Sequence, residues 1–242
     1  MNKDLIHSRF AKTLPSYDEN AKIQKIMAKK LLEFSEKKSY PKILEIGCGT
    51  GFLTDILSNN TEWKSYTALD IVGECREYIS QINPEIEFIE ADIEDYLKNS
   101  SEKFDLIISN AALQWVNDFE TTVRTLKNML NPDGHLLFST FGKENFREIY
   151  SLLGTGLDYY SPKEIEDLFK DLDIKTEEEI HVMGFKTPME ILKHLKLTGV
   201  NAIENTSWTK SDLSKFEKGY SNLCPIRPTL TYNPIYIKIH SD

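Results

Sequence analysis

The sequence predicts an α/β fold with a doubly wound, mainly parallel sheet, and three observations support this. Short apolar runs typical of buried strands alternate with helical periodicity up to about residue 140. A Gly-x-Gly-x-Gly turn at residues 47–51 follows the first of these runs, which predicts a strand-to-helix turn. An acidic residue, Asp70, ends the next apolar run. Because parallel strands need crossover helices, we expect right-handed connections between them.

The first 38 residues are expected to form an N-terminal helical leader followed by a helix. Helical periodicity covers residues 20–36 and places one group of apolar side chains inward, with the lysines between Lys22 and Lys38 on a solvated face. The inward group is Ile23, Ile26, Met27, Leu31 and Phe34. The preceding leader holds Arg9, Phe10, Pro15 and Tyr17.

Residues 40–186 are expected to form the core. Ser161, an N-cap residue, precedes Pro162 at the first position of one predicted helix. We expect strands at 43–46, 66–70, 86–90, 104–109 and 136–139, the last after a turn at 131–134, and a sixth strand near 174–183. We expect helices at 51–59, 73–82, 118–130 and 161–169.

Residues 187–227 break this alternation and are interpreted as a helical lid insertion, with helices at 188–197 and 210–222. Residues 228–242 carry the last strand, at 229–239. Because proline has no amide hydrogen to donate, we expect Pro234 at a sheet edge or a bulge. The whole chain, residues 1–242, is predicted to be one domain.

The glycine-rich turn and Asp70 together indicate a site for a nucleotide-type cofactor. Glycines at 47, 49 and 51 let the backbone lie against a ligand, and a carboxylate at 70 can accept hydrogen bonds from two ribose hydroxyls. Asp92 and Ile93 follow the third strand and are candidates to contact an adenine ring. All of these residues come at the carboxyl ends of predicted strands, where open α/β sheets bind ligands.

Composition narrows the classes of function. The net charge of −9 and a pI near 5.2 argue against a nucleic-acid partner, whose phosphates need a basic surface. No apolar run reaches the ~18 residues of a membrane span, and residues 1–10 lack the apolar core of a signal peptide. The three cysteines and five histidines show no disulfide or metal-ligand spacing. We therefore expect a cytoplasmic protein without a metal and without a nucleic-acid or membrane partner.

The segment Glu45-Ile-Gly-Cys-Gly-Thr-Gly51 resembles the first motif of the class I S-adenosylmethionine-dependent methyltransferases. This resemblance implies a Rossmann-like, seven-stranded sheet whose last strand is antiparallel. It also implies S-adenosylmethionine as cofactor and S-adenosylhomocysteine as product. The implied contacts are Asp70 at the ribose, Asp92 and Ile93 at the adenine, and Glu45, Gly47 and Asn110 at the methionine end, with Ile71 as a further cofactor contact. An NAD-binding domain is the competing interpretation, but it prefers Gly-x-Gly-x-x-Gly.

Further segments resemble the malonyl-acyl-carrier protein O-methyltransferases of biotin synthesis, a family within this class. The matching segments are 9–21, 111–115, 139–142, 146–148, 195–200 and 230–232. This resemblance implies transfer of a methyl group to the free carboxylate of a malonyl thioester, carried by acyl-carrier protein or by coenzyme A. A carboxylate is ionised at neutral pH, so it needs no general base. The enzyme is expected to act as a monomer.

Two residues are candidates to hold that carboxylate. Arg147 could grip it through its planar guanidinium, although a surface ion pair with Glu144 or Glu148 is the alternative. Tyr17 could donate a hydrogen bond from the leader, or could simply pin the leader by packing. Trp115 could form an apolar wall beside the acceptor, or could be a core residue.

Three other functions remain open on the sequence alone. The chain could methylate another small carboxylate or a quinone, as trans-aconitate methyltransferases and quinone methyltransferases do. It could act on RNA or protein, which its acidic balance disfavours. It could also bind S-adenosylmethionine without catalysis, in which case the cofactor would stabilise the protein but no acyl acceptor would be methylated.

Overall fold

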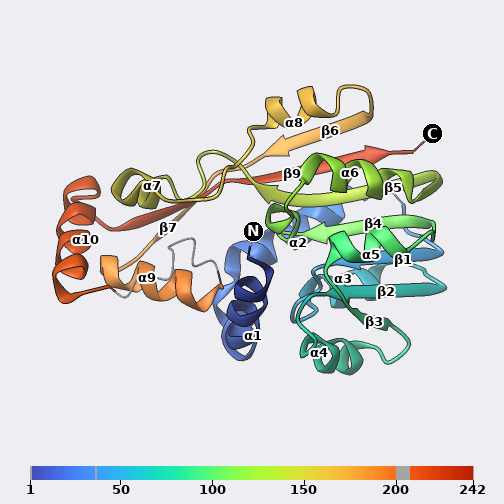
Figure 1. Cartoon of the computed structure of the whole chain (residues 1–242), viewed down its shortest axis with the longest axis horizontal. Helices are drawn as coiled ribbons and strands as arrows, with labels where there is room; N and C mark the ends of the chain where they lie inside the picture. The colour runs from blue at the N-terminus through green and yellow to red at the C-terminus, as the bar shows by residue number, and fades with distance from the viewer. Residues whose placement is uncertain (1, 36, 200–207, 242) are drawn as a thin grey trace.

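The computed structural model describes the chain apart from residues 1, 36, 200–207 and 242 (Figure 1). Its centre is a seven-stranded sheet in which β9 alone runs antiparallel to its two neighbours, as predicted. The strand order is β3 (Glu87–Glu90), β2 (Ser65–Asp70), β1 (Lys42–Ile46), β4 (Phe104–Asn110), β5 (Leu130–Phe141), β9 (Pro234–His240) and β6 (Asp173–Glu178).

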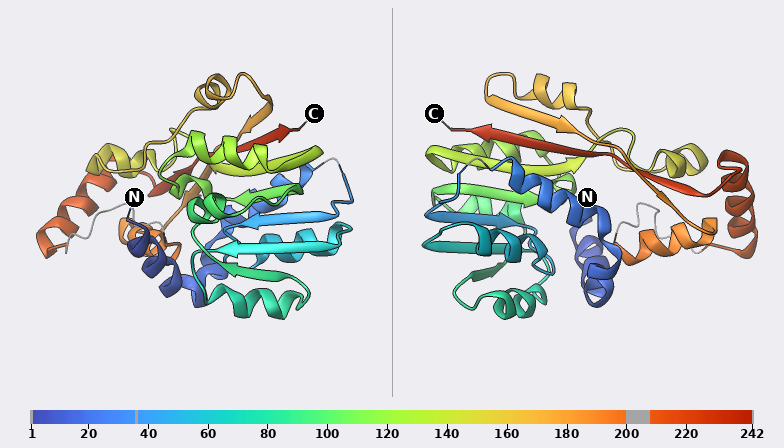
Figure 2. Two further views of the ribbon diagram at one scale, coloured as in Figure 1. Left: turned by 45° about the vertical axis from the view of Figure 1, so that its right-hand side comes forward. Right: turned by 180° about the vertical axis from the view of Figure 1, so that it is seen from behind.

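Helices cover both faces of this sheet, which confirms the doubly wound architecture. Alternate side chains of β1 point to opposite faces, so Ile43 lies in one apolar core and Leu44 in the other, both fully buried. The helices on the Ile43 side are α2 (Lys22–Glu33), α3 (Phe52–Asn60) and α4 (Cys75–Ile82). Those on the Leu44 side are α5 (Ile93–Asn99), α6 (Phe119–Asn128) and α8 (Pro162–Leu168). From behind, α2 lies across the sheet (Figure 2).

The leader is helical and lies directly before α2. Helix α1 (Lys3–Asn20) begins with the Asn2 side chain accepting a hydrogen bond from the Leu5 amide, and it includes Pro15. The chain breaks at Ala21, so the second helix covers residues 22–33 rather than 20–36. Four of the five apolar residues predicted to face inward are buried, namely Ile23, Met27, Leu31 and Phe34. The prediction for Ile26 was wrong, because it lies beside this stripe and is 43% exposed.

Two predicted strands are each divided between two sheets. Residues 174–183 form β6 and then β7 (His181–Gly184), and residues 229–239 form β8 (Thr229–Tyr232) and then β9. Strands β7 and β8 pair with each other as a separate two-stranded sheet. Figure 1 shows these strands extending from the main sheet toward α9 and α10. The two chain segments β6–β7 and β8–β9 therefore connect the main sheet to the segment that contains α9 and α10.

Asn233 marks the point where the strands change sheets. This residue is completely buried, and both its backbone and its side chain make hydrogen bonds to two different segments. Its side-chain amide donates to Glu178 Oε1 at 2.9 Å, and its side-chain oxygen accepts from the Glu144 amide at 3.0 Å. Pro234 therefore begins a strand inside the sheet, between β5 and β6. The prediction that it would lie at a sheet edge or a bulge was wrong. Only its carbonyl is needed there, and it accepts from the Glu179 amide.

The predicted lid helices are confirmed, and the structure adds others that the sequence pattern missed. Helices α9 (Pro188–Leu197) and α10 (Lys210–Leu223) match the predictions, while residues 200–207 of the predicted insertion, and Val200 of the segment 195–200, lie outside the described residues. Ser161 and Glu164 form the capping box of α8. The unpredicted elements are α5, α7 (Arg147–Leu153) and the short helix η1 (Leu113–Trp115). The predicted turn at 131–134 lies inside β5, at a shift of its register with β4.

Candidate active site

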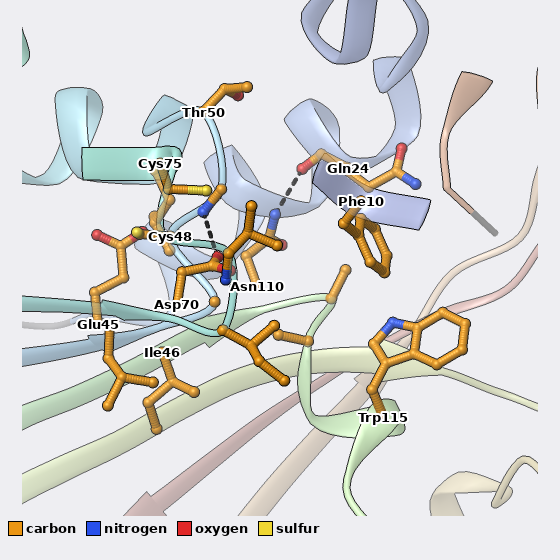
Figure 3. Close-up of a pocket in the computed structure, with 18 of the residues that line it drawn as sticks. Phe10, Gln24, Glu45, Ile46, Cys48, Thr50, Asp70, Cys75, Asn110 and Trp115 are labelled. Atoms are coloured by element: carbon orange, nitrogen blue, oxygen red, sulfur yellow. Dashed lines mark hydrogen bonds between the residues drawn. The ribbon is translucent and has the colours of Figure 1, made fainter. Parts of the chain in front are cut away.

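A cavity lies at the carboxyl ends of β1, β2 and β4, where the leader closes over the sheet. Figure 3 shows its wall, to which the glycine-rich loop, α1, α2 and η1 all contribute. Ten of the predicted site residues line it: Tyr17, Glu45, Gly47, Gly49, Asp70, Ile71, Asp92, Ile93, Asn110 and Trp115. Two do not, because Gly51 is the N-cap residue of α3 and Arg147 begins α7.

The glycine-rich loop is shaped so that its backbone faces the cavity. Gly47 has a φ of +72°, and a Cβ atom there would lie 2.4 Å from the Ala112 Cβ, so a side chain would clash with the loop after β4. At Gly49, with a φ of +54°, an added Cβ would meet no protein atom within 4 Å. Gly49 therefore borders open space in which a ligand can lie against the main chain.

Asp70 and this loop hold each other in place. The Asp70 carboxylate accepts from the Gly49 amide at 2.8 Å (Figure 3). It also accepts from the Val72 amide at 2.9 Å. Burial raises the pKa of Asp70, and these backbone hydrogen bonds act in the opposite direction. A carboxylate has about four acceptor positions, so Asp70 keeps capacity for ligand hydroxyls.

Glu45 lies beside the cavity, but its carboxylate is already bonded to protein. Thr54 donates to Glu45 Oε2 at 2.8 Å, and the Tyr66 hydroxyl donates to the same oxygen. Figure 3 shows this carboxylate turned away from Asn110 and Trp115. Burial raises the pKa of Glu45 to about 7, against the opposing effect of those hydrogen bonds. Glu45 thus ties β1 to α3 and β2 beneath the loop.

Lys3 links the beginning of the leader to the far side of the cavity. Its ammonium lies 2.8 Å from both Asp92 and Glu94 and donates to the Trp115 carbonyl at 3.2 Å. Partial burial lowers the pKa of Lys3, but the two carboxylates outweigh this and raise it overall. Asp92 also caps α5 by accepting from the Glu94 amide at 2.7 Å. No local sequence pattern pointed to Lys3, because its partners lie about 90 to 110 residues further along the chain.

Asn110 is fixed between the leader side and the sheet. Its side-chain amide donates to the Gln24 carbonyl of α2 at 3.0 Å, and its side-chain oxygen accepts from Ser139 at 2.7 Å. Ala111, which follows it, has a φ of +52°, a conformation that non-glycine residues rarely adopt. The chain therefore adopts a left-handed backbone conformation directly after β4, at the cavity wall.

The leader brings an aromatic and hydroxyl-bearing wall to the cavity. Tyr17 and Phe10 of α1 line it, and the Phe10 ring meets the Trp115 ring edge to face at 5.8 Å. Burial, Asp70 and Asp18 all raise the pKa of Tyr17, so its phenol keeps the proton and can donate. Asp18 in turn accepts from Thr50 in the glycine-rich loop at 2.9 Å.

Arg147 is on the protein surface. Its side chain is 54% exposed and lies 3.1 Å from Glu144, which is the ion pair considered as the alternative.

A buried polar pair connects the lid helix α9 with β8. His194 Nε2 of α9 and the Tyr232 hydroxyl of β8 are 2.6 Å apart, and burial lowers the pKa of His194. Tyr17 and Tyr232 are close enough for Tyr17 to raise the pKa of Tyr232.

Two kinds of feature are absent from the part of the chain that the structure describes. No group of three or more His, Cys, Asp or Glu residues there is arranged to hold a metal ion. None of the helices described is long and apolar enough to cross a membrane.

Comparisons with known proteins agree with this arrangement. A family model described as a methyltransferase domain matches residues 17–179. A protein of Calditerrivibrio nitroreducens named malonyl-acyl-carrier protein O-methyltransferase is 38% identical over 242 residues, covering 97% of this chain and 96% of that protein. One of the same name from Chlorobium luteolum is 35% identical, covering 97% and 94%. The solved N-methyltransferase NodS of Bradyrhizobium japonicum, in complex with S-adenosylhomocysteine, shares the fold, with a TM-score of 0.56, 15% identity and 98% of each chain covered.

Proposed function

This chain belongs to the malonyl-acyl-carrier protein O-methyltransferases, and from this we infer that it methylates the free carboxylate of malonyl-acyl-carrier protein. The observation that carries this inference is the 38% identity to a relative of that name over nearly the whole of both chains. The methyl ester then primes pimeloyl formation in biotin synthesis, as the family resemblance implies. Methylation removes a charge that would be costly to bury in an apolar channel.

The residues of the cavity fit S-adenosylmethionine. The open space over Gly49 admits a ligand against the main chain, and Asp70 has acceptor positions left for two ribose hydroxyls. We assign the adenine end to Asp92 with Ile71 and Ile93, and the methionine end to Gly47 and Asn110. Glu45 supports the loop from below through Thr54 and Tyr66.

The acceptor side of the reaction requires positioning rather than acid–base catalysis. S-adenosylmethionine supplies an electrophilic methyl group, and its transfer to a carboxylate oxygen gives the ester and S-adenosylhomocysteine without a proton being taken up or released. Tyr17 donates a hydrogen bond that orients the carboxylate, while Phe10 and Trp115 exclude water. A raised pKa of Tyr17 supports this role, because the phenol stays a donor.

Arg147 is our second candidate for the acceptor carboxylate. It would act by exchanging its ion pair with Glu144 for one with the malonyl group. We predict that Arg147→Ala raises the KM for malonyl-acyl-carrier protein about tenfold and leaves S-adenosylhomocysteine binding unchanged. Steady-state kinetics and calorimetry measure the two quantities. Glu144→Gln is the control, because it removes the ion pair but keeps the arginine. Unchanged kinetics of Arg147→Ala would reduce this residue to its surface ion pair.

The assigned reaction is tested by intact-mass spectrometry. Malonyl-acyl-carrier protein is incubated with the purified protein and S-adenosylmethionine, and malonyl-coenzyme A is tested in parallel. We expect the malonyl carrier to gain one methyl group. Acetyl-acyl-carrier protein, which has no free carboxylate, should gain none. Methylation of neither malonyl thioester, in protein that binds S-adenosylhomocysteine, would contradict the proposed acceptor.

A further inference from the structure

Two segments of this acidic protein have a positive balance of charge. Residues 1–33 contain seven Lys and Arg against four Asp and Glu, and residues 187–227 contain six against four. The rest of the chain contains 16 Lys and Arg against 30 Asp and Glu. Of these three parts of the chain, only the leader with α2 and the lid have a cationic excess.

These two segments are neighbours in the structure. Helix α1 packs against α9, as Figures 1 and 2 show from several sides. At their contact the Phe10 ring lies so close to Gly199 that an added Cβ atom would be 2.8 Å from it. Lys22, at the beginning of α2, is close enough to contribute to the lowered pKa of His194 in α9. The two segments with a cationic excess therefore lie side by side.

Four lysines of these two segments are available to a partner. Lys12, Lys22, Lys193 and Lys196 are exposed, and none of them makes an ion pair with the residues that the structure describes. Elsewhere on the leader and α2, Lys3, Lys25 and Lys30 do pair with carboxylates. We call the four lysines the α1–α9 lysine patch.

Helix α1 belongs both to the patch and to the cavity wall. Helix α1 presents Lys12 to solvent, whereas Thr13, Leu14 and Tyr17 of the same helix line the cavity. A partner bound at Lys12 would therefore contact the same helix that lines the cavity.

We propose that the α1–α9 lysine patch is the docking surface for the acyl-carrier protein, a small acidic protein. This rests on the proposed function and identifies the surface that recognises its substrate. Two proteins of net negative charge repel each other at long range, so productive encounter needs a local region of opposite sign. Exposed lysines act mainly on the association rate and lose their effect at high salt.

The proposal is tested with two matched charge reversals. Lys193→Glu/Lys196→Glu alters the patch, and Lys163→Glu/Lys170→Glu alters two exposed lysines in and just after α8 with the same change in net charge. We expect the patch variant to lose about tenfold in kcat/KM for malonyl-acyl-carrier protein and less than about twofold for malonyl-coenzyme A. The α8 variant should stay within about twofold for both, and added salt should reduce the difference between the variants.

Direct binding of unacylated carrier protein, followed by fluorescence anisotropy, decides the docking question separately from methyl transfer. Weaker binding by the patch variant than by the α8 variant supports the docking surface, even if no methyl group is transferred. Equal binding by both variants overturns the proposal, as does an equal loss of activity with carrier protein and coenzyme A. Unchanged affinity for S-adenosylhomocysteine shows that the variants are folded. A wild-type protein that binds the carrier but methylates no malonyl thioester would contradict the proposed function alone.

Discussion

The carboxyl edge of the sheet and the cap formed by the leader and lid are built in different ways, although helix α1 of the cap faces the same cavity as the sheet edge. At the sheet edge, Asp70 and Asn110 come at the ends of strands, and backbone pairing fixes where they lie. In the cap, Tyr17, His194 and Tyr232 come from three distant segments and are held by side-chain contacts. Under the proposed function, cofactor binding would depend on main-chain architecture, and acceptor binding would depend on packing between separate elements.

The pH dependence of the free energy of unfolding tests whether Glu45, at the sheet edge, is buried with its proton. The folded protein holds the pKa of Glu45 at about 7, above its ordinary value of 4.5. Between these values the folded chain keeps a proton that the unfolded chain has lost, so stability should fall as pH rises from about 4.5 to 7. This effect is worth about 3 kcal/mol. Urea unfolding from pH 4.5 to 8 should show a shallower decline in Glu45→Gln than in wild type, and parallel curves would argue against a buried proton at Glu45.

Removal of the Asp70 carboxylate should disable the sheet edge while sparing the cap. We predict that Asp70→Ala weakens S-adenosylhomocysteine binding about 100-fold, because two charge-assisted hydrogen bonds to the ribose are lost. Calorimetry measures this, with the exposed Asp95→Ala as control. Carrier-protein binding should be unchanged. A variant that also lost carrier binding would show that the two regions are not independent.

Tyr17→Phe should have the opposite effect to Asp70→Ala, reducing activity on the acceptor while leaving cofactor binding nearly unchanged. It removes one hydroxyl from the cap, and we expect about a tenfold loss of kcat/KM for malonyl-acyl-carrier protein. The affinity for S-adenosylhomocysteine should change by less than about twofold. Kinetics and calorimetry on the same preparation separate the two. If the larger change fell on cofactor affinity, Tyr17 would belong to the cofactor site.

Lys3 should give the smallest effect, since it joins the two regions through partly exposed ion pairs. We predict that Lys3→Gln weakens S-adenosylhomocysteine binding about threefold and makes the leader more sensitive to limited proteolysis. Lys98→Gln, which breaks an exposed ion pair with Asp95, serves as control. Equal effects of the two substitutions would assign Lys3 to ordinary surface pairing.

The same contrast explains what the sequence could predict. Strand ends follow local patterns, so most of the sheet and the cavity residues at its carboxyl edge could be predicted in advance, whereas Tyr17 and Trp115 were predicted from the family resemblance. The ion pair of Lys3 with Asp92 and the pairing of His194 with Tyr232 join residues far apart in the chain. No local period reports such contacts. The division of the last strand at Asn233 was missed for the same reason, since its cause is a set of hydrogen bonds to residues 142–145 and 178–179.

The position of Asn233 also bears on how this protein can diversify. The chain leaves the main sheet after Glu178 of β6 and returns to it at Pro234 of β9, and these two strands are paired with each other. A homologous segment with the same two ends could therefore be exchanged as a unit without disturbing the glycine-rich loop. Recombination at this joint offers a route to new acceptors on an inherited cofactor site, and chimaeras with boundaries at these two residues are suited to engineering acceptor range.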